Sequence, residues 1–248
     1  MIEIKNLVKN YPGKKVLDGL NLKIETGEIF SVMGPSGTGK STFLKCLIGL
    51  NRPDSGDIFI DGKNIAFAKD EKEIQKIRSK MGYLFQEGAL FDSLCVWENV
   101  AFGLKYLTDI NPREYLKIAG EKLKLVGLEN SEYLKISELS GGMKKRAALA
   151  RAIAPGPSYL LYDEPTTGLD PVTGETVAKL IKEMSEKLKV TSVVVTHDVK
   201  LAVEISDRIA FFYGGKIIEI GSPSQIRESK NAMVKEFLEN CSCADKRL

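Results

Sequence analysis

Apolar and polar residues alternate in the two-residue period of β-strands along much of the first sixty residues. Residues 2–9 and 16–25 follow this alternation on either side of the turn at Pro12-Gly13, and residues 56–62 repeat it before a further turn. Strands of this kind have one face on a core and the other in solvent, as is usual in antiparallel sheets. The pattern therefore predicts an antiparallel sheet in the first part of the chain.

The middle of the chain changes to the period of amphipathic helices. A short strand is expected at residues 82–86, ending in Gln86, and helices are expected over residues 97–106, 112–126 and 141–154. This part is predicted to form a helical lobe.

Continuous apolar runs lie on both sides of this helical part and indicate strands buried on both faces. They are residues 28–33, 159–162 and 191–196, and helices are expected over residues 41–48 and 173–188. Two further runs, 208–213 and 216–220, flank Gly214-Gly215 and predict a β-hairpin. Strands that alternate with helices put the chain in the α/β class.

The composition is that of one globular protein rather than two fused copies. The 248 residues allow one substantial core and a smaller lobe. With 36 basic and 33 acidic residues the formal net charge is +3, too balanced for a nucleic-acid-binding protein. No apolar run reaches the roughly 18 residues that span a bilayer and no signal peptide is evident, so the chain is not expected to form a transport pathway. Four scattered cysteines suggest a reducing cytoplasm rather than a disulfide framework.

The run Gly34-Pro35-Ser36-Gly37-Thr38-Gly39-Lys40-Ser41 has the spacing G-x-x-x-x-G-K-[ST] between an expected strand and an expected helix. Glycines let the backbone N–H groups approach phosphate oxygens, and the helix N-terminus adds a partial positive charge. Lys40 is expected to reach the β- and γ-phosphates, and the Ser41 hydroxyl to bind Mg²⁺. A chance turn with a surface lysine is the alternative, and the full spacing disfavours it.

Two carboxylates follow the apolar run 159–162. Asp163 is expected to enter the Mg²⁺ shell, and Glu164 to polarise a water in line with the γ-phosphate, with strand alternation sending it to the other side of the strand end. The alternative is an acidic strand end that forms hydrogen bonds with Thr166 or Thr167. The phosphate loop in the same chain favours the catalytic interpretation.

Two further features concern the γ-phosphate. His197, the only histidine, ends the run 191–196 at the edge where α/β sheets place their ligands, which favours a phosphate sensor over a structural histidine. Leu139-Ser140-Gly141-Gly142-Met143 is a second glycine-containing turn that opens a helix. Two phosphate-binding elements with one nucleotide fold suggest two chains closing on one nucleotide. The following Lys144-Lys145-Arg146 is expected to be a solvated basic face, with at most weak electrostatic help to ATP.

In this order the motifs resemble the ATP-hydrolysing subunit of ATP-binding-cassette (ABC) transporters, over roughly residues 1 to 225. The resemblance rests on the phosphate loop, Gln86, the signature at 139–143, Tyr162–Glu164 with Gly168–Pro171, and His197. It implies a P-loop NTPase fold with a RecA-like core, a flanking antiparallel β-subdomain and a helical subdomain. The expected boundaries are 1–86 and 158–221 for the ATP-binding core, 87–157 for the helical subdomain and 222–248 for a C-terminal helical tail.

The resemblance also implies roles for single residues. Tyr11 would stack on adenine, unless it is an ordinary strand-edge tyrosine, and Gln86 would contact Mg²⁺ or the attacking water. The ATP-binding set would run from Gly34 to Thr42, and the catalytic set would comprise Glu164, His197, Gln86 and Lys40. Ser140, Gly141 and Gly142 would bind the γ-phosphate held by a second copy in a head-to-tail dimer, and Asp170 would line the seam between the two.

The loop after Gln86 indicates which subfamily of ABC transporter ATPases the chain resembles. Gln86 to Leu94 reads Q-E-G-A-L-F-D-S-L and, with Met143 where many members carry Gln, resembles the ATPases of Mla-type, Mce-associated phospholipid transporters. The implied partners are a separate permease docking near Gly88–Val100, an Mce-type substrate-binding protein and a small regulatory subunit. The implied location is the cytoplasmic face of the inner membrane. Phe91 and Trp97 are the candidate docking aromatics. The alternative is that they pack the lobe, and for Trp97 the two interpretations are equally supported.

Two other functions stay open. ATPases of polar amino-acid importers resemble the rest of the chain but usually differ in this loop. A non-transport clamp, such as a cofactor-assembly factor, would use the same ATP-driven closure. DNA-end clamps carry very long coiled coils and translation-associated members carry two cassettes, and this sequence has neither.

Overall fold

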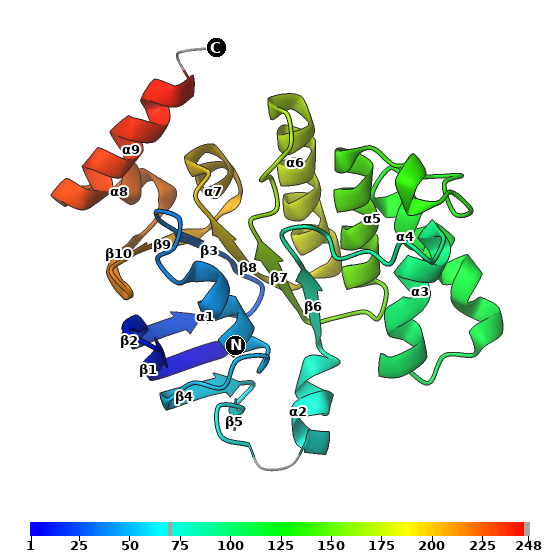
Figure 1. The fold of residues 1–248 in the computed structure, drawn as a ribbon, viewed down its shortest axis with the longest axis horizontal. Coiled ribbons are helices and arrows are strands. Elements are labelled where there is room, and N and C mark those ends of the chain that lie inside the picture. The colour runs from blue at the N-terminus through cyan, green and yellow to red at the C-terminus, as the bar shows by residue number, and fades with distance from the viewer. Residues whose placement is uncertain (69–70, 246–248) are drawn as a thin grey trace. The chain divides into compact units, whose positions relative to one another are not determined.

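The computed structural model describes residues 1–68 and 71–245. The chain divides into two compact units (Figure 1). The first comprises Met1–Gln75 and Thr191–Leu248, and the second comprises Lys76–Val190. The second unit is therefore inserted between the two parts of the first.

The first unit begins with the predicted antiparallel sheet. Its strands are β1 (Ile2–Tyr11), β2 (Lys14–Ile24), β4 (Ser55–Ile60) and β5 (Lys63–Asn64), in the order β2-β1-β4-β5. Ile2 of β1 pairs with Ile24 on one side and with Ile60 on the other. All three are buried, so the apolar alternation seen in the sequence forms one face of this sheet.

A second set of strands in the first unit leads to the phosphate loop. β3 (Ile29–Met33) pairs in parallel with β8 (Thr191–Thr196) and β9 (Arg208–Tyr213), and β9 forms the predicted hairpin with β10 (Lys216–Gly221). Every residue of β3 is buried, as expected for a strand covered on both faces. α1 (Lys40–Leu47) follows β3 directly after the loop.

Three helices close the first unit: α7 (Val199–Ile205), α8 (Pro223–Arg227) and α9 (Ala232–Asp245). They share a core cluster with β3 and β9, whose buried members are Met33, Ala202, Ile209, Phe211, Ile226 and Val234. Phe237 of α9 packs edge-on against Phe211 with ring centroids 5.2 Å apart. The C-terminal helix is thus anchored to the strand that leads to the phosphate loop and to its neighbour.

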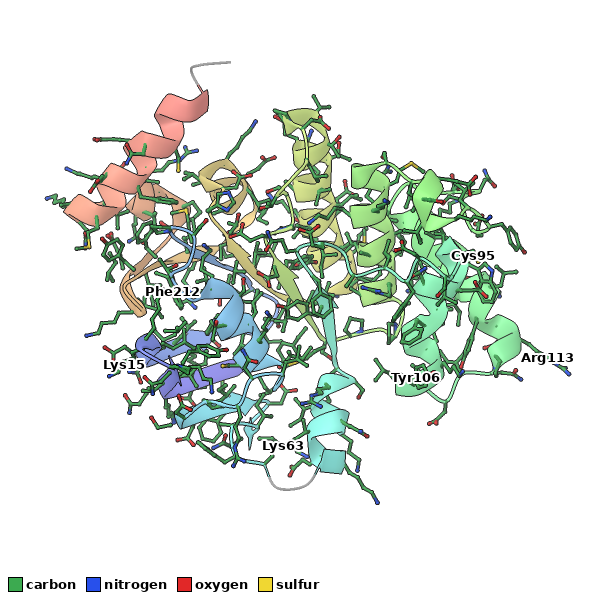
Figure 2. The ribbon with its side chains drawn as sticks, viewed as in Figure 1. Lys15, Lys63, Cys95, Tyr106, Arg113 and Phe212 are labelled. Atoms are coloured by element: carbon green, nitrogen blue, oxygen red, sulfur yellow. The ribbon has the colours of Figure 1, made fainter. Side chains whose placement is uncertain are left out.

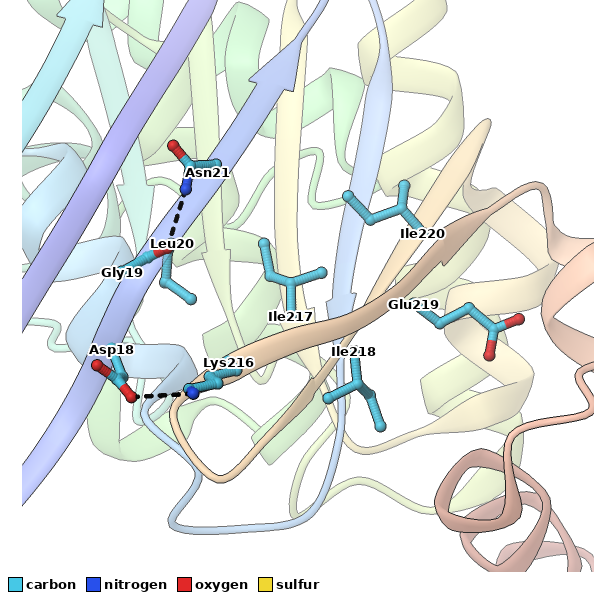
Figure 3. Close-up of a pocket in the computed structure, with 9 residues that line it drawn as sticks. All are labelled: Asp18, Gly19, Leu20, Asn21, Lys216, Ile217, Ile218, Glu219 and Ile220. Carbon is cyan, nitrogen blue, oxygen red and sulfur yellow. Dashed lines mark hydrogen bonds and ion pairs between the residues drawn. The ribbon is translucent and has the colours of Figure 1, made fainter.

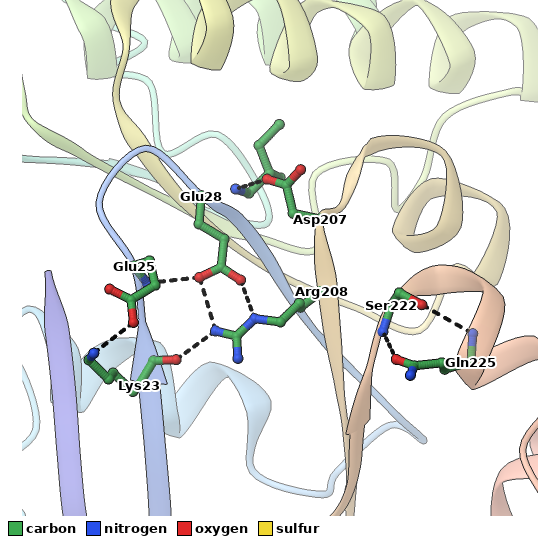
Figure 4. A network of polar contacts seen from close by, with 8 residues as sticks. Lys23, Glu25, Glu28, Asp207, Arg208, Ser222 and Gln225 are labelled. Carbon is green, nitrogen blue, oxygen red and sulfur yellow. Dashed lines mark hydrogen bonds and ion pairs between the residues drawn. The ribbon is translucent and has the colours of Figure 1, made fainter.

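A polar network holds the beginning of β3 (Figure 4). The buried Glu28 carboxylate accepts hydrogen bonds from Arg208 Nε at 2.6 Å, Arg208 Nη2 at 3.0 Å and the backbone N–H of Glu25 at 2.8 Å. Arg208 Nη2 also donates to the carbonyl of Lys23 at 2.8 Å. A guanidinium that forms paired bonds with a carboxylate fixes the orientation of both groups. The start of the strand that leads to the phosphate loop is therefore tied to β9 and β2.

A contact between β2 and β10 ties the two sets of strands together within the first unit. Asp18 N donates to the Gly215 carbonyl at 2.9 Å, and the Asp18 carboxylate pairs with Lys216 Nζ at 3.3 Å. Hydrogen bonds from Lys15 and Lys216 lower the pKa of Asp18. Beyond this contact the strands line an open groove of about 510 Å³, with Leu20, Ile217 and Ile220 along it (Figure 3).

The second unit combines a parallel strand pair with helices. β6 (Met81–Leu84) pairs with β7 (Tyr159–Asp163), with Leu84 opposite Tyr162. Its helices are α3 (Val96–Leu107), α4 (Tyr115–Leu125), α5 (Gly141–Ile153) and α6 (Pro171–Leu188). α2 (Glu71–Arg78) precedes β6. α3, α4 and α5 pack on one another, and their buried residues include Val100, Leu104, Leu123 and Leu149.

The structure confirms the α/β class and corrects some details. β6 ends at Leu84, so Gln86 lies two residues beyond the strand rather than at its end. The expected helix at 112–126 begins with a 3-10 turn at Pro112–Glu114. α2 and α7 were not predicted, whereas α8 and α9 lie within residues 222–248, where a helical tail was expected. Within residues 1–68 and 71–245, no helix is long and apolar enough to cross a membrane. The subdomain boundaries proposed from the resemblance stay predictions.

Candidate functional site

The glycines of the phosphate loop occupy positions that a side chain would block. Gly34 has φ 155° and Gly39, the N-cap of α1, has φ 104°. A Cβ atom on Gly34 would lie 2.2 Å from the carbonyl oxygen of Phe212, and one on Gly39 would lie 2.8 Å from that of Val16 (Phe212 is labelled in Figure 2). The loop therefore packs against β9 and β2 at distances that only glycine allows.

Lys40 lies folded onto the phosphate loop. Its side chain is buried, and Nζ donates to the carbonyls of Gly34 at 2.8 Å and Pro35 at 3.1 Å. Thr38 Oγ1 donates to the same Pro35 carbonyl at 2.8 Å. The positive charge is thus held at the N-terminus of α1, where an anion is favoured. Ser36 and Gly37 are exposed, and Ser41 and Thr42 are partly buried in the first turn of α1.

His197 lies at the same sheet edge as the phosphate loop. β3 and β8 run parallel with Met33 opposite Thr196, so Gly34 and His197 follow directly from two neighbouring strand ends. His197 is exposed. The next residue, Asp198, caps α7 by accepting a hydrogen bond from Leu201 N at 3.0 Å. The first unit therefore brings together the loop and the histidine, as the sequence predicted.

Tyr11 at the end of β1 has a side chain suited to stacking. Its ring is 42% exposed, and its hydroxyl accepts a hydrogen bond from Asn51 Nδ2 at 2.9 Å. Lys9 Nζ lies 5.5 Å from the ring centroid. Asn51 follows α1 in the chain, and the sequence gave no indication of this contact because the two residues are forty positions apart.

The acidic pair lies in the second unit, at the shared carboxyl edge of β6 and β7. Asp163 is buried and Oδ2 accepts a hydrogen bond from the Tyr83 hydroxyl at 3.0 Å. Burial and the charge of Asp163 raise the pKa of Tyr83. Because β6 and β7 are parallel with Leu84 opposite Tyr162, the chain after β6 carries Gln86 to the same edge as Asp163. Tyr83 was missed as a partner because it reads as an ordinary strand residue.

Glu164 differs from the strand-end geometry expected for it. It has a left-handed backbone, with φ 49°, directly after β7 ends at Asp163. The expectation that strand alternation orients Glu164 is therefore wrong, because a left-handed residue breaks the pleat. Its side chain is buried, and Thr167 Oγ1 donates to Oε2 at 3.4 Å. This contact is the one named in the alternative interpretation, and it leaves the catalytic role a prediction.

The signature turn opens α5. Ser140 is the N-cap, and its Oγ accepts a hydrogen bond from Met143 N at 3.2 Å. Ser140 and Gly141 are exposed, whereas Gly142 is buried and a Cβ atom there would lie 2.4 Å from Thr173 Cγ2. Two of the three predicted phosphate-binding residues are thus accessible, and the third also allows α5 to pack against α6.

Asp170 is the N-cap of α6. Its Oδ1 accepts a hydrogen bond from Thr173 N at 3.0 Å. Hydrogen bonds from the Thr173 side chain and backbone lower the pKa of the carboxyl group. Asp170 remains exposed, so it is available to a neighbouring molecule.

The basic run after the signature is not the solvated face that was expected. Lys145 is buried, and its Nζ donates to the carbonyls of Gln86 and Glu164. Arg146 Nη1 donates to the carbonyl of Gly127 at 2.8 Å. Further along α5, Arg151 donates to the carbonyls of Gly88 and Ala89, each at 2.6 Å. α5 therefore holds the loop that follows Gln86.

The donor set predicted for Mg²⁺ consists of hard oxygen ligands. Ser41 lies in the first unit, and Gln86 and Asp163 lie in the second. A hydroxyl, an amide oxygen and a carboxylate are ligands that suit Mg²⁺, which usually keeps additional contacts to substrate phosphates. Across residues 1–68 and 71–245 there is no cluster of three or more His, Cys, Asp or Glu side chains able to hold a metal.

The fold and these motifs define a nucleotide-binding enzyme of the P-loop class. A family model described as ABC transporter matches residues 17–167, more than half of the chain. The chain belongs to the ABC transporter ATP-binding family, binds ATP and is the ATPase subunit of an ABC transporter.

Two relatives and one solved structure illustrate the similarity. The chain is 41% identical over 238 residues (96% of this chain, 90% of the relative) to the intermembrane phospholipid transport system ATP-binding protein MlaF of Haemophilus influenzae. It is 44% identical over 243 residues (96% of this chain, 71% of the relative) to the methionine import ATP-binding protein MetN of Carboxydothermus hydrogenoformans. A dimeric ATP-binding cassette in a post-hydrolysis state with ADP and Pi matches with a TM-score of 0.83 and 37% identity, over 90% of this chain and 99% of that chain. The predicted family, fold and ATPase activity are confirmed; the roles of single residues stay predictions.

Proposed function

We propose that two copies of this chain bind two ATP molecules head to tail, and that their closure and reopening drive phospholipid transport through a separate membrane permease. The chain would then lie on the cytoplasmic face of the inner membrane, with an Mce-type substrate-binding protein and a small regulatory subunit as further partners.

The nucleotide is held by residues of several elements. Tyr11 stacks on adenine, and the phosphates bind to backbone N–H groups between Gly34 and Thr42, except at Pro35, which has none. Lys40 exchanges its carbonyl partners for the β- and γ-phosphates. Ser41, Gln86 and Asp163 would hold Mg²⁺, which would supply positive charge beside the phosphates. The hydrogen bond from Tyr83 orients the Asp163 carboxylate.

ATP hydrolysis is assigned to Glu164, the second acidic residue, directly after the end of β7. Glu164 accepts a proton from the attacking water, and the water oxygen bonds to the γ-phosphorus while the bond from phosphorus to the β–γ bridging oxygen breaks. The electron pair of that bond leaves with ADP. His197 donates a hydrogen bond to the γ-phosphate, which makes closure sensitive to ATP or ADP. This role of His197 is supported by its position beside the phosphate loop, at the end of the neighbouring strand.

The partly exposed signature turn at residues 139–143 is the main support for the proposed dimer. Ser140 and Gly141 open a helix of thirteen residues, whose N-terminus favours an anion, and Gly142 follows them. In the proposed dimer these residues bind the γ-phosphate held by the other copy, and Asp170 lines the seam. The solved relative described above is itself a dimer.

The permease docks, in this proposal, on an apolar hollow of the second unit. A cavity of about 400 Å³ is lined by residues of β6, α3, α5 and the loop after Gln86, including Phe85, Ala89, Phe91 and Phe102. Phe91, Phe102 and Tyr106 form a chain of ring contacts at 4.6 and 5.1 Å, and all three are exposed (Tyr106 is labelled in Figure 2). An exposed aromatic surface beside a cavity suits an amphipathic permease helix. Trp97 is only partly exposed, so Phe91 is the stronger candidate of the two.

The loop from Gln86 to Leu94 is the observation that carries the phospholipid assignment, within a chain 41% identical to a phospholipid transport ATPase. The second candidate is amino-acid import, favoured by the 44% identity to a methionine import ATPase. The two candidates share the ATP chemistry and differ only in cargo.

Capture of the chain from native membranes in mild detergent tests the cargo. A permease with an Mce-type protein and bound phospholipid is the expected result. A permease with an amino-acid-binding protein would replace the phospholipid assignment by the second candidate. Soluble partners alone would contradict the transport proposal itself.

A further inference from the structure

Lys145 occupies an unusual position for a charged side chain. It is only 7% exposed, in a stretch of α5 that otherwise carries buried alanines and leucine. Burial lowers the pKa of its ammonium group, and the nearby carboxylates of Glu87, Asp163 and Glu164 act in the opposite direction. A buried cation is unfavourable unless its donors are paired. The contacts that Lys145 makes therefore indicate why a lysine is present there.

Those contacts join the two loops that hold the predicted catalytic side chains. Lys145 Nζ donates to the carbonyl of Gln86 and, at 3.4 Å, to the carbonyl of Glu164. The two acceptors come from different strand ends, after β6 and after β7. One ammonium group thus connects the backbone of Gln86 to the backbone of Glu164.

The backbone conformation of Glu164 explains why its carbonyl is placed to accept a hydrogen bond from Lys145. β7 ends at Asp163, and Glu164 adopts a left-handed conformation that L-residues other than Asn and Asp rarely use. A left-handed residue at the end of a strand turns its carbonyl away from the strand ladder, where another donor must satisfy it. The Glu164 carbonyl accepts a hydrogen bond from Thr167 N at 3.3 Å within its own turn and another from Lys145 Nζ at 3.4 Å. Lys145 therefore adds a donor from α5 to the local turn and ties the backbone of Glu164 to that helix.

The same helix also holds the loop next to the cavity described above. Arg151, two turns further along α5, donates to the carbonyls of Gly88 and Ala89, and Ala89 and Arg151 both line that cavity. The residues from Gln86 to Ala89 are therefore held by two cations of one helix. Only the first of them, Lys145, also contacts Glu164.

We propose that Lys145 is a positioning residue for ATP hydrolysis, which fixes the Gln86 loop and the Glu164 backbone in one arrangement. The proposal rests on the roles given above to Gln86 and Glu164. Lys145 acts through the backbone carbonyls of these two residues.

The test compares Lys145→Met with three other variants in the detergent-solubilised complex recovered with the tagged chain. Methionine keeps the volume and apolar stem but removes the donors, so a residue that only fills space tolerates it. We expect kcat for ATP to fall about tenfold to a hundredfold, since small misplacements of reacting groups have effects of this size. KM for ATP should change by no more than about twofold, because the phosphate loop and Tyr11 belong to the other unit.

Rescue and control variants separate positioning from packing. Lys145→Gln and Lys145→Arg retain N–H donors and should recover most of kcat, whereas Lys179→Met makes the same change on an exposed face of α6 and should have no effect. Equal losses in Lys145→Met and Lys145→Gln, or a parallel rise in KM, would contradict the proposal.

Glu164→Gln separates failure of this inference from failure of the proposed mechanism. If Glu164→Gln abolishes hydrolysis and Lys145→Met turns over at the unaltered rate, Lys145 is not a positioning residue but the assigned base stands. If Glu164→Gln hydrolyses ATP normally, the mechanism on which the inference rests is wrong, and the inference is overturned with it.

Discussion

Glu164 is the residue on which the proposed chemistry depends most. Its buried carboxylate follows a strand end, and its recorded hydrogen bond from Thr167 is long, at 3.4 Å. Replacement by Gln keeps the shape and removes the basic oxygen, so phosphate release should fall at least a hundredfold while ATP still binds. Steady-state phosphate release and nucleotide binding measure the two effects. Normal turnover in Glu164→Gln would mean that another group activates the water.

Arg208 provides a prediction about stability rather than activity. Arg208→Ala leaves the buried Glu28 carboxylate without its paired guanidinium bonds. Because the Arg208 side chain is itself 38% exposed and water can partly replace it, we expect a loss of about 1–3 kcal/mol in the free energy of unfolding. Urea denaturation measures this loss.

Lys216→Ala is the matched control for Arg208→Ala. It removes an ion pair with Asp18 whose partners are 61% and 31% exposed, and should have less than about 1 kcal/mol of effect. A similar loss in both variants would show that the Glu28 network (Figure 4) has no special role.

The residues that the sequence identified and those that it missed differ in one respect. Lys40 and Ser140 belong to short motifs of fixed spacing, and His197 is the only histidine and ends an apolar run, so a local pattern is enough to find them. Lys145 was assigned to a solvated face because three adjacent cations usually are solvated. Gly142, Lys145 and Leu149 lie three and four positions apart, on one face of α5, and all three are buried. This helical periodicity was the feature of the sequence that could have placed Lys145 on the buried face of α5.

The prediction of helices and strands is limited in the same way, because local sequence patterns do not contain contacts between distant residues. The strands of the parallel set were predicted closely, because continuous apolar runs between turn residues have few other interpretations. β6 was expected to reach Gln86 but ends at Leu84, and the left-handed Glu164 was expected to continue a strand. α7 was not expected, and α9 was expected only as part of a helical tail with no assigned packing. Helix α9 is anchored by Val234 and Phe237 to a core of distant residues, and such contacts cannot be read from local patterns.

The packing of α5 on α6 provides a prediction for an element. Gly142→Ala gains up to about 1 kcal/mol in helix propensity, yet its Cβ would lie 2.4 Å from Thr173 Cγ2. Overpacking of this kind destabilises by about 1–3 kcal/mol, so a net loss is expected in thermal denaturation. Adding Thr173→Ser removes the clashing methyl group and should restore stability. If the single variant is as stable as the parent, α5 can shift and this contact does not constrain the two helices.

The whole molecule acts, in the proposed mechanism, only as a pair. Ser140 is exposed at the start of α5 and Asp170 is exposed at the start of α6, so both are available to a second copy. In the Glu164→Gln background, ATP should convert the monomer to a dimer because hydrolysis no longer reopens it. Ser140→Arg places a bulky cation on the helix start and should prevent this conversion while ATP still binds, since the phosphate loop of the same chain is unchanged.

Size-exclusion chromatography with and without ATP measures the conversion, and Ser137→Arg is the control because Ser137 is exposed and precedes the signature. A monomer in Ser140→Arg and a dimer in Ser137→Arg, with equal ATP binding, is the expected result. Dimers in both variants would indicate that the signature does not face the second nucleotide, and the head-to-tail arrangement would then have to be abandoned. Loss of dimers in both would attribute the effect to added charge, because an arginine three residues before Ser140 has no direct route to the γ-phosphate in the proposed arrangement.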